Sequence, residues 1–183
     1  MKQYLLILGL SFLLVGIFSA CKDDPLDALR ADELTMLDKY IKDNNLADTK
    51  DESGIYFKLL QTSTDTTQIR SGYKVMIYFN ITLIDDTTVV FTTEDGKGHN
   101  YEEFPFYVDV NNAVVNESYV QQIAGLHKGL KKMKVGEKAF MVIPSELAFK
   151  AVDYSSIGIP RFSTLVVTVT IKSALSPKEQ NDQ

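Results

Sequence analysis

The sequence predicts an α+β domain in which a mainly antiparallel sheet wraps around one short helix, with an amphipathic helix in front of it. Apolar and polar residues alternate over 73–83 and again over 165–172, which indicates strands with one core face. Between 119 and 133, apolar residues recur on a single helical face. Strand patterns outnumber helical ones and follow each other at hairpin spacing, which is typical of the α+β class.

The first 20 residues have the pattern of an export signal. Lys2 precedes an apolar run from Tyr4 to Phe18, and the small residues Ser19 and Ala20 follow. A run of about 15 residues is short for a spanning helix, which needs about 20. We therefore expect residues 1–20 to be a signal peptide.

Cys21 is the only cysteine, and it follows the signal directly. The tetrad F-S-A-C at 18–21 resembles the bacterial lipobox, which implies a lipoprotein acylated at Cys21 and anchored in the bilayer by more than one acyl chain. The alternative is a secreted protein with a free thiol. The residues K-D-D at 22–24 resemble a short acidic surface-export signal of lipoproteins in Bacteroidetes-like lineages, or form a plain solvated tether. An outer-membrane lipoprotein is expected, on the periplasmic face or at the cell surface.

The mature chain divides into a lipid tether and helix at 21–53, a sheet domain at 54–174 and a polar tail at 175–183. Pro25 suits a first helical turn, and the apolar residues of the helix ending near 44–45 are Leu26, Leu29, Leu34, Leu37 and Ile41. Strands are expected over 55–59, 73–83, 89–93, 104–110, 138–143 and 165–172. Ser118 and Gln121 resemble a capping box for the helix of the domain, which Gly125 and Gly129 weaken.

Four motifs in order resemble the FKBP-type peptidyl-prolyl isomerases. They are P-F at 105–106, G-L-H-K-G-L-K-K-M-K-V-G-E-K-A at 125–139, I-P-S-E-L-A-F at 143–149 and G-I-P followed by S-T-L at 158–165. The resemblance covers roughly 54–174. It implies an FKBP-like half-barrel of antiparallel strands around a short helix, and an apolar pocket that binds proline-containing polypeptide segments.

The resemblance also assigns the pocket residue by residue. Phe91, Phe106 and Ile123 match the family, with the backbone N–H of Ile123 as the expected donor to the substrate carbonyl. Phe79 and Phe149 stand where the family has tyrosines. The other positions of the pocket or its edge are Leu126 for a tryptophan, Thr92 for an aspartate, Val167 for a phenylalanine, Lys150 for a glycine, and Ile159. Phe57, Phe104 and Phe140 are assigned to the core.

Two functions remain open at this point. One is an isomerase that assists folding of exported proteins, with activity reduced by the lost hydroxyls and aromatic surface. The other is a non-catalytic chaperone or partner-binding lipoprotein that uses the same cleft. The choice depends on whether Phe79→Ala or Ile123→Ala abolishes proline isomerisation or only the holding of unfolded chains.

Composition and net charge limit the classes of protein and ligand that fit this sequence. The 183 residues are 45% hydrophobic and 23% charged, which is ordinary for a globular protein. A formal net charge of −5 argues against nucleic acid, which needs a basic footprint. His99 and His127 are expected at the surface, and neither a metal nor a cofactor is predicted. A monomer is expected.

Overall fold

The structure is a computed structural model that describes residues 24–84, 88–95, 97, 99, 102–110 and 118–182. The predicted signal peptide, Cys21 and the turn at 85–86 lie outside the described residues. The elements in chain order are α2 (Pro25–Asp43), η1 (Ala47–Thr49), β1 (Tyr56–Gln61), β2 (Lys74–Leu83), β3 (Val89–Thr92), β4 (Phe104–Tyr107), η3 (Val120–Gln122), α3 (Ala124–Leu130), β5 (Lys138–Ile143), η4 (Ser145–Leu147), η5 (Ser155–Ile157), β6 (Leu165–Leu175) and α4 (Pro177–Asn181).

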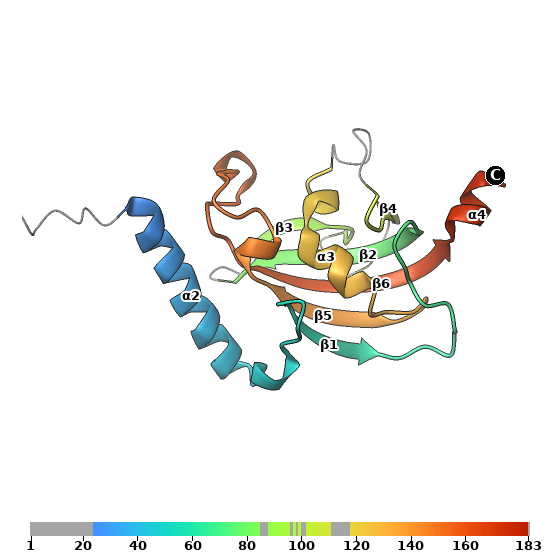
Figure 1. The fold of residues 1–183 in the computed structure, drawn as a ribbon, viewed down its shortest axis with the longest axis horizontal. Helices are drawn as coiled ribbons and strands as arrows, with labels where there is room; N and C mark the ends of the chain where they lie inside the picture. Colours follow the sequence, from blue (N-terminus) through green and yellow to red (C-terminus); the bar gives the residue numbers. More distant parts are fainter. Residues whose placement is uncertain are drawn as a thin grey trace, which may run out of the picture.

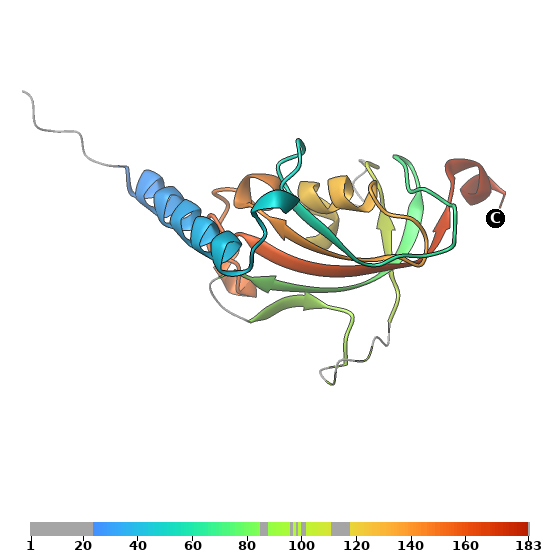
Figure 2. The same cartoon turned by 90° about the horizontal axis from the view of Figure 1, so that it is seen from below.

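The strands form one antiparallel sheet in the order β1-β5-β6-β2-β3, as the α+β class predicts. Strand β4 also pairs with β2. It covers Lys74–Ile77, whereas β3 covers Asn80–Thr82, so the two short strands share one edge of β2. Helix α3 lies across one face of the curved sheet (Figures 1 and 2).

The main core lies between α3 and the sheet, and two glycines set how close they approach. A Cβ on Gly125 would lie 2.4 Å from Cγ2 of Ile143, and one on Gly129 would lie 2.3 Å from Sδ of Met141. The glycines that lower the helix propensity of this segment therefore allow α3 to pack directly on β5.

Helix α2 begins and ends as predicted, but its apolar face is only partly buried. Asp24 caps it by accepting from the N–H of Leu26. Leu37 and Ile41 pack with Val142 on the face of the sheet opposite α3. The expectation that Leu29 and Leu34 belong to the buried face is wrong, because they are 45% and 47% exposed.

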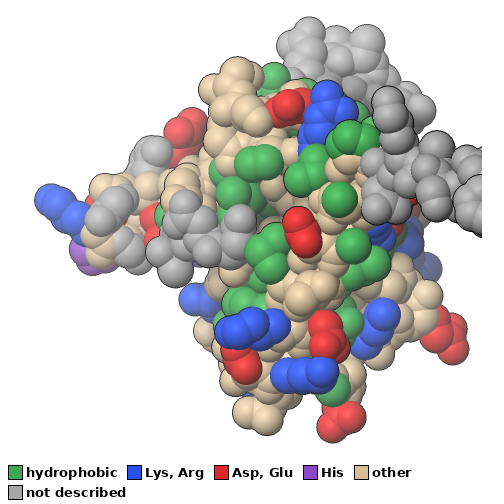
Figure 3. Space-filling view, turned by 90° about the vertical axis from the view of Figure 1, so that its left-hand side faces the viewer, with side chains coloured by type: hydrophobic (Ala, Val, Ile, Leu, Met, Phe, Trp, Pro, Cys, Tyr) green, Lys and Arg blue, Asp and Glu red, His purple; other side chains and the backbone are tan. Residues whose placement is uncertain are grey.

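Leu29 and Leu34 are exposed because of the position of α2. The helix lies at one end of the sheet, and its first half extends past the sheet (Figure 1). Figure 3 views this end and shows hydrophobic side chains exposed among acidic and basic ones. In the first half of α2 the buried residue is Glu33. Among the described residues, no helix is both long and apolar enough to cross a bilayer.

The last residues, expected as a polar tail, extend the sheet and then form a short helix. Strand β6 continues to Leu175, and α4 begins with a capping box between Ser176 and Glu179. The Gln180 amide donates to the carbonyl of Gly72 at 2.9 Å, which attaches α4 to the turn before β2.

Candidate functional site

Phe79 and Phe104 form the first part of the site. Phe79, on β2, is buried, and the half-buried ring of Phe104 meets it edge to face with 5.5 Å between ring centroids. The sequence placed Phe106 in the pocket and Phe104 in the core. In the structure Phe106 is fully buried, with its ring 4.6 Å from that of His127. Phe104 and Phe106 share a face of β4, so alternation alone could not tell which ring lies nearer to solvent.

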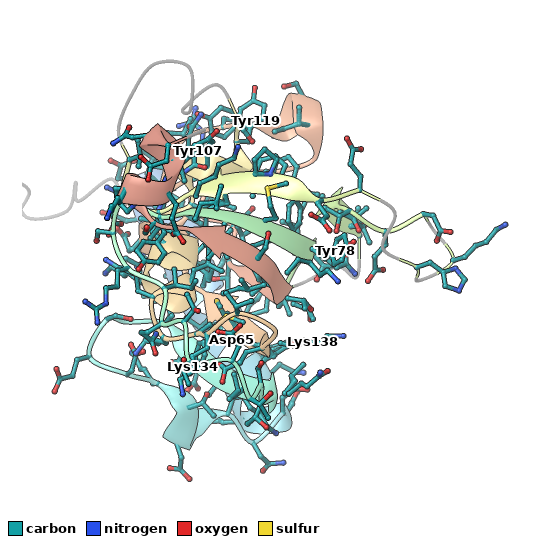
Figure 4. All side chains as sticks on the ribbon, turned by 90° about the vertical axis from the view of Figure 1, so that its right-hand side faces the viewer. Asp65, Tyr78, Tyr107, Tyr119, Lys134 and Lys138 are labelled. Carbon is teal, nitrogen blue, oxygen red and sulfur yellow. The ribbon has the colours of Figure 1, made fainter. Side chains whose placement is uncertain are left out.

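A row of four rings forms the second part, and we call Phe91, Tyr119, Tyr154 and Phe149 the aromatic row. Phe91 stacks on Tyr119 at 6.2 Å, and Tyr119 meets Tyr154 edge to face at 5.1 Å. Tyr154 meets Phe149 in the same way at 5.3 Å. Phe149 at one end of the row is buried, Tyr119 is 36% exposed, and Phe91 at the other end is half-buried. Figure 4 shows Tyr119 at one end of the molecule.

The sequence missed Tyr119 and Tyr154. Tyr119 was assigned to the helical face of 119–133, and Tyr154 lay in an unpatterned loop. Neither had a periodicity that indicates a site, because their contact depends on the tertiary fold.

The two parts lie on the same face of the sheet. Phe91 is opposite Ile81 in the β2–β3 pairing, so Phe79, two residues before Ile81, is its diagonal neighbour. Three fully buried aliphatic side chains lie behind the rings. They are Leu126 of α3, Ile159 of the loop between β5 and β6, and Val167 of β6. Val167 is opposite Ile81 as well. The structure thus brings the predicted apolar residues to one face, with their inner members sealed from water.

The predicted polar position, Thr92, is followed by a second threonine, Thr93. Thr92 is exposed, and its Oγ1 accepts from the N–H of Glu94. Thr93 is buried, and its Oγ1 accepts from the N–H of Phe79 at 2.9 Å. Thr93 shares the inward face with Phe91, two residues earlier. Its hydroxyl therefore lies on the face of the rings, and strand alternation counted from Phe91 could have found it.

The expected backbone donor, Ile123, lies between η3 and α3 and is fully buried. Its N–H donates to the carbonyl of Val120 at 3.3 Å, longer than the usual range of about 2.7 to 3.2 Å. A substrate carbonyl would have to share this N–H or replace the weak internal bond.

Gln121 and His127 hold this turn in place. The predicted capping box of Ser118 and Gln121 is wrong, because the Gln121 amide instead bonds both backbone groups of Tyr107 on β4. The helix is also broken at Ile123. His127, predicted at the surface, has a side chain only 14% exposed. Its Nδ1 accepts from the N–H of Asp109 at 2.9 Å and its Nε2 lies 2.8 Å from the carbonyl of Gln121.

These contacts fit the neutral imidazole with the proton on Nε2. Burial is the largest cause that lowers the pKa of His127, and it outweighs the opposite effects of the Gln121 carbonyl and of Asp109. The unfolded chain therefore takes up this proton at a higher pH than the folded one, so stability falls as pH drops below about 6.5. The protonated ring could no longer accept from Asp109.

We expect urea midpoints measured from pH 7.5 to 5.5 to fall more steeply for the natural chain than for His127→Gln, which has no titrating group at this position. Comparing the two chains removes the contribution of the carboxylates, which both share. Parallel curves would show that His127 is not the group responsible.

Lys150 follows Phe149 and occupies a left-handed conformation with φ of 56°. Its N–H donates to the carbonyl of Ser145 and its carbonyl accepts from Phe162, so the loop fixes this geometry. A side chain here costs about 1 kcal/mol that glycine avoids.

We expect Lys150→Gly to raise the free energy of unfolding by about that amount in urea titrations, and Lys150→Ala, which keeps Cβ, to leave it unchanged. Equal stability of the two variants would refute the conformational explanation.

Two further observations concern metal-binding groups and other hollows near the aromatic rings. Within the described residues, His, Cys, Asp and Glu form no group of three or more that could hold a metal ion. A polar hollow lies on the opposite face of the sheet, where Figure 4 shows Tyr78 and Lys138. Its lining includes Tyr78, Asn80 and Lys138, and also Phe79, which β2 shares between the hollow and the aromatic site.

Comparison with known proteins identifies the fold and the family. FkpA from Escherichia coli superposes with a TM-score of 0.64 at 23% identity, over 83% of this chain and 63% of that one. A peptidyl-prolyl cis-trans isomerase from Pseudomonas syringae pv. tomato has a TM-score of 0.62 at 20% identity, over 84% and 98%. The N-terminal domain of FKBP42 from Arabidopsis thaliana has 0.56 at 15%, over 69% and 89%.

This chain thus spans somewhat less than two thirds of the Escherichia coli protein. No curated protein matches it in sequence. The sequence pattern of the FKBP-type peptidyl-prolyl cis-trans isomerases matches residues 65–172, which is more than half of the chain. The chain therefore belongs to the FKBP-type peptidyl-prolyl cis-trans isomerase family.

Proposed function

We propose that this protein catalyses cis–trans isomerisation of X–Pro bonds in exported polypeptides, at the face formed by Phe79, Phe104 and the aromatic row. The observation that carries the proposal is a set of aromatic rings above fully buried aliphatic side chains, none of them charged. The barrier to rotation, about 18 to 20 kcal/mol, comes from the partial double bond of the planar amide. Water stabilises the charge-separated planar form, so a dry apolar surface favours the twisted transition state.

Three features favour turnover below that of a family member with the full pocket. Phe79 and Phe149 lack the hydroxyls that the family's tyrosines carry, and Leu126 offers less surface than a tryptophan. The N–H of Ile123 already has an internal acceptor. A hydrogen bond of this kind contributes about 1 kcal/mol, which is roughly a fivefold change in rate.

We expect Phe149→Tyr to raise kcat/KM about fivefold in a protease-coupled assay with a proline tetrapeptide, because it restores a hydroxyl beside Tyr154. Phe57→Tyr adds the same hydroxyl on β1, at the opposite edge of the sheet, and serves as the control. Unchanged turnover in Phe149→Tyr would mean that the missing hydroxyl does not limit activity. If the natural chain gives no catalysis above the uncatalysed rate, the isomerase proposal fails.

The second candidate is a chaperone that holds unfolded segments without isomerising them. The occupied N–H of Ile123 favours it, because a substrate carbonyl would then lack its donor. Phe79→Ala separates the two: loss of isomerisation with intact prevention of aggregation supports the enzyme. Loss of aggregation prevention in a chain that never isomerises supports the chaperone.

The proposed location is the outer membrane, through acylated Cys21, on the periplasmic face or at the cell surface. The pattern of residues 2–21 supports it, as does the start of α2 at Pro25, only four residues beyond Cys21. Four residues of extended chain span at most about 14 Å, so the domain would be held at the bilayer. Labelled palmitate should enter the natural chain and not Cys21→Ser, and protease added to intact cells should distinguish the two faces. Equal labelling of both chains would contradict acylation at Cys21.

A further inference from the structure

We propose that Glu33 of the N-terminal helix is a positioning residue for the aromatic site, because its carboxylate holds both ends of the loop that carries Phe149 and Tyr154. This inference rests on the proposed isomerase function for its kinetic consequence. Its structural consequence can be measured independently of activity.

Glu33 is 1% exposed and its carboxylate bonds two separate segments. Oε1 accepts from the N–H of Ser145 at 2.8 Å and from Oγ1 of Thr164 at 2.7 Å. Oε2 accepts from Oγ of Ser145 at 2.7 Å. Ser145 follows β5 and Thr164 precedes β6, so one side chain links the two ends of the loop between these strands.

Arg30 completes the arrangement one helical turn earlier. It forms an ion pair with Oε2 of Glu33 and donates to Oγ of Ser145 at 2.9 Å. Its other terminal nitrogen lies 3.2 Å from Oε1 of Glu146, and its guanidinium lies over the ring of Phe162. A buried carboxylate is costly unless it is paired and hydrogen-bonded, and Arg30 with Ser145 and Thr164 meets both conditions.

Hydrogen bonds within the loop connect the residues bound by Glu33 to the rings of the aromatic site. The carbonyl of Ser145 accepts from the N–H of Ala148 at 2.9 Å and of Lys150 at 2.8 Å, so the residues on both sides of Phe149 are tied to Ser145. Further along, Tyr154 and Ile159 exchange backbone hydrogen bonds and present Tyr154 to Phe149. The described loop contains only the short turns η4 and η5, so it relies on such ties for its shape.

The position of the loop agrees with this role. In Figures 1 and 2 the orange segment between β5 and β6 lies at the end of the sheet where α2 lies. Leu37 and Ile41 already attach the second half of α2 through apolar contacts. Glu33 adds a directional, hydrogen-bonded connection from the first half to the loop of the site.

The test compares the full chain, purified in mild detergent, with Glu33→Ala, Glu33→Gln and Asp32→Asn. Glu33→Gln keeps an oxygen for Ser145 and Thr164. Asp32→Asn makes the same chemical change at the neighbouring exposed residue. Tyrosines are fluorinated, and Tyr154→Phe identifies the Tyr154 signal in the ¹⁹F spectrum. Kinetics with a proline tetrapeptide give kcat and KM separately.

We expect Glu33→Ala to shift or broaden the Tyr154 signal and to raise KM at least fivefold, because the rings are no longer prearranged. Glu33→Gln should stay within about twofold of the natural chain, and Asp32→Asn should be unchanged. If Glu33→Ala does not fold, Thr164→Val, which removes one bond at the far end of the loop, should shift the same signal and raise KM about twofold.

An unshifted Tyr154 signal in Glu33→Ala, or in Thr164→Val if the first variant is unfolded, would overturn the proposal. An unchanged KM together with a lowered stability would also overturn it, since a purely structural residue gives that result. If the natural chain lacks isomerase activity, the proposed function fails while the Tyr154 signal still decides the role of Glu33.

Discussion

Phe106→Ala is expected to lower the free energy of unfolding by about 3 to 5 kcal/mol, the largest loss of stability among the substitutions considered. Phe106 is fully buried in the core, and its ring contacts His127. Removing the ring leaves a cavity beside His127, and the surrounding side chains can fill it only in part. Urea unfolding followed by circular dichroism measures the change.

Phe106→Leu is the matched control, because it retains most of the buried volume and should lose less than half as much stability. A Phe106→Ala chain as stable as the natural one would mean that the packing of this ring does not stabilise the core.

Phe104→Ala is expected to lower kcat/KM about thirtyfold while costing less stability than Phe106→Ala. Phe104 is half-buried against Phe79, so it has ring surface left to grip a prolyl side chain. Burying an aromatic side chain contributes about 2 kcal/mol, which corresponds to the stated loss in rate if the contact is made in the transition state. Protease-coupled assays on the folded variant and on the natural chain measure the change in kcat/KM.

Phe57→Ala is the control for Phe104→Ala. Phe57 is also a half-buried phenylalanine of the sheet, but it lies on β1, at the edge opposite β3 and β4. Its replacement should leave kcat/KM unchanged. Equal losses in the two variants would assign the effect of Phe104 to general destabilisation.

The sequence predicts the sheet well because its period-two pattern is a direct consequence of burial on one face. Strand β2 begins at Lys74, one residue after the predicted start, and ends at Leu83 as predicted. The same pattern says only which face a residue joins. It does not say how far that residue lies from solvent, so it could not show that Phe106 is fully buried while Phe104 is half-buried.

Other differences arise from tertiary contacts that local patterns do not encode. Gln121 has the spacing of a capping residue, yet β4 offers its amide two backbone partners. His127 was predicted at the surface, yet the fold places it between Gln121 and Asp109. Glu33 has no counterpart in the apolar pattern of the helix, because the partners that hold it in the interior lie more than 100 residues away.

The central claim is that an X–Pro bond is isomerised on the face formed by Phe79, Phe104 and the aromatic row. Two-dimensional exchange NMR on a proline peptide tests it most directly, because it observes the cis and trans signals without a protease. With the natural chain, exchange cross-peaks should appear at mixing times far shorter than the uncatalysed tens of seconds, and Phe79→Ala should remove them. Cross-peaks of equal intensity with the natural chain and with a Phe79→Ala, Phe104→Ala double variant would contradict the account.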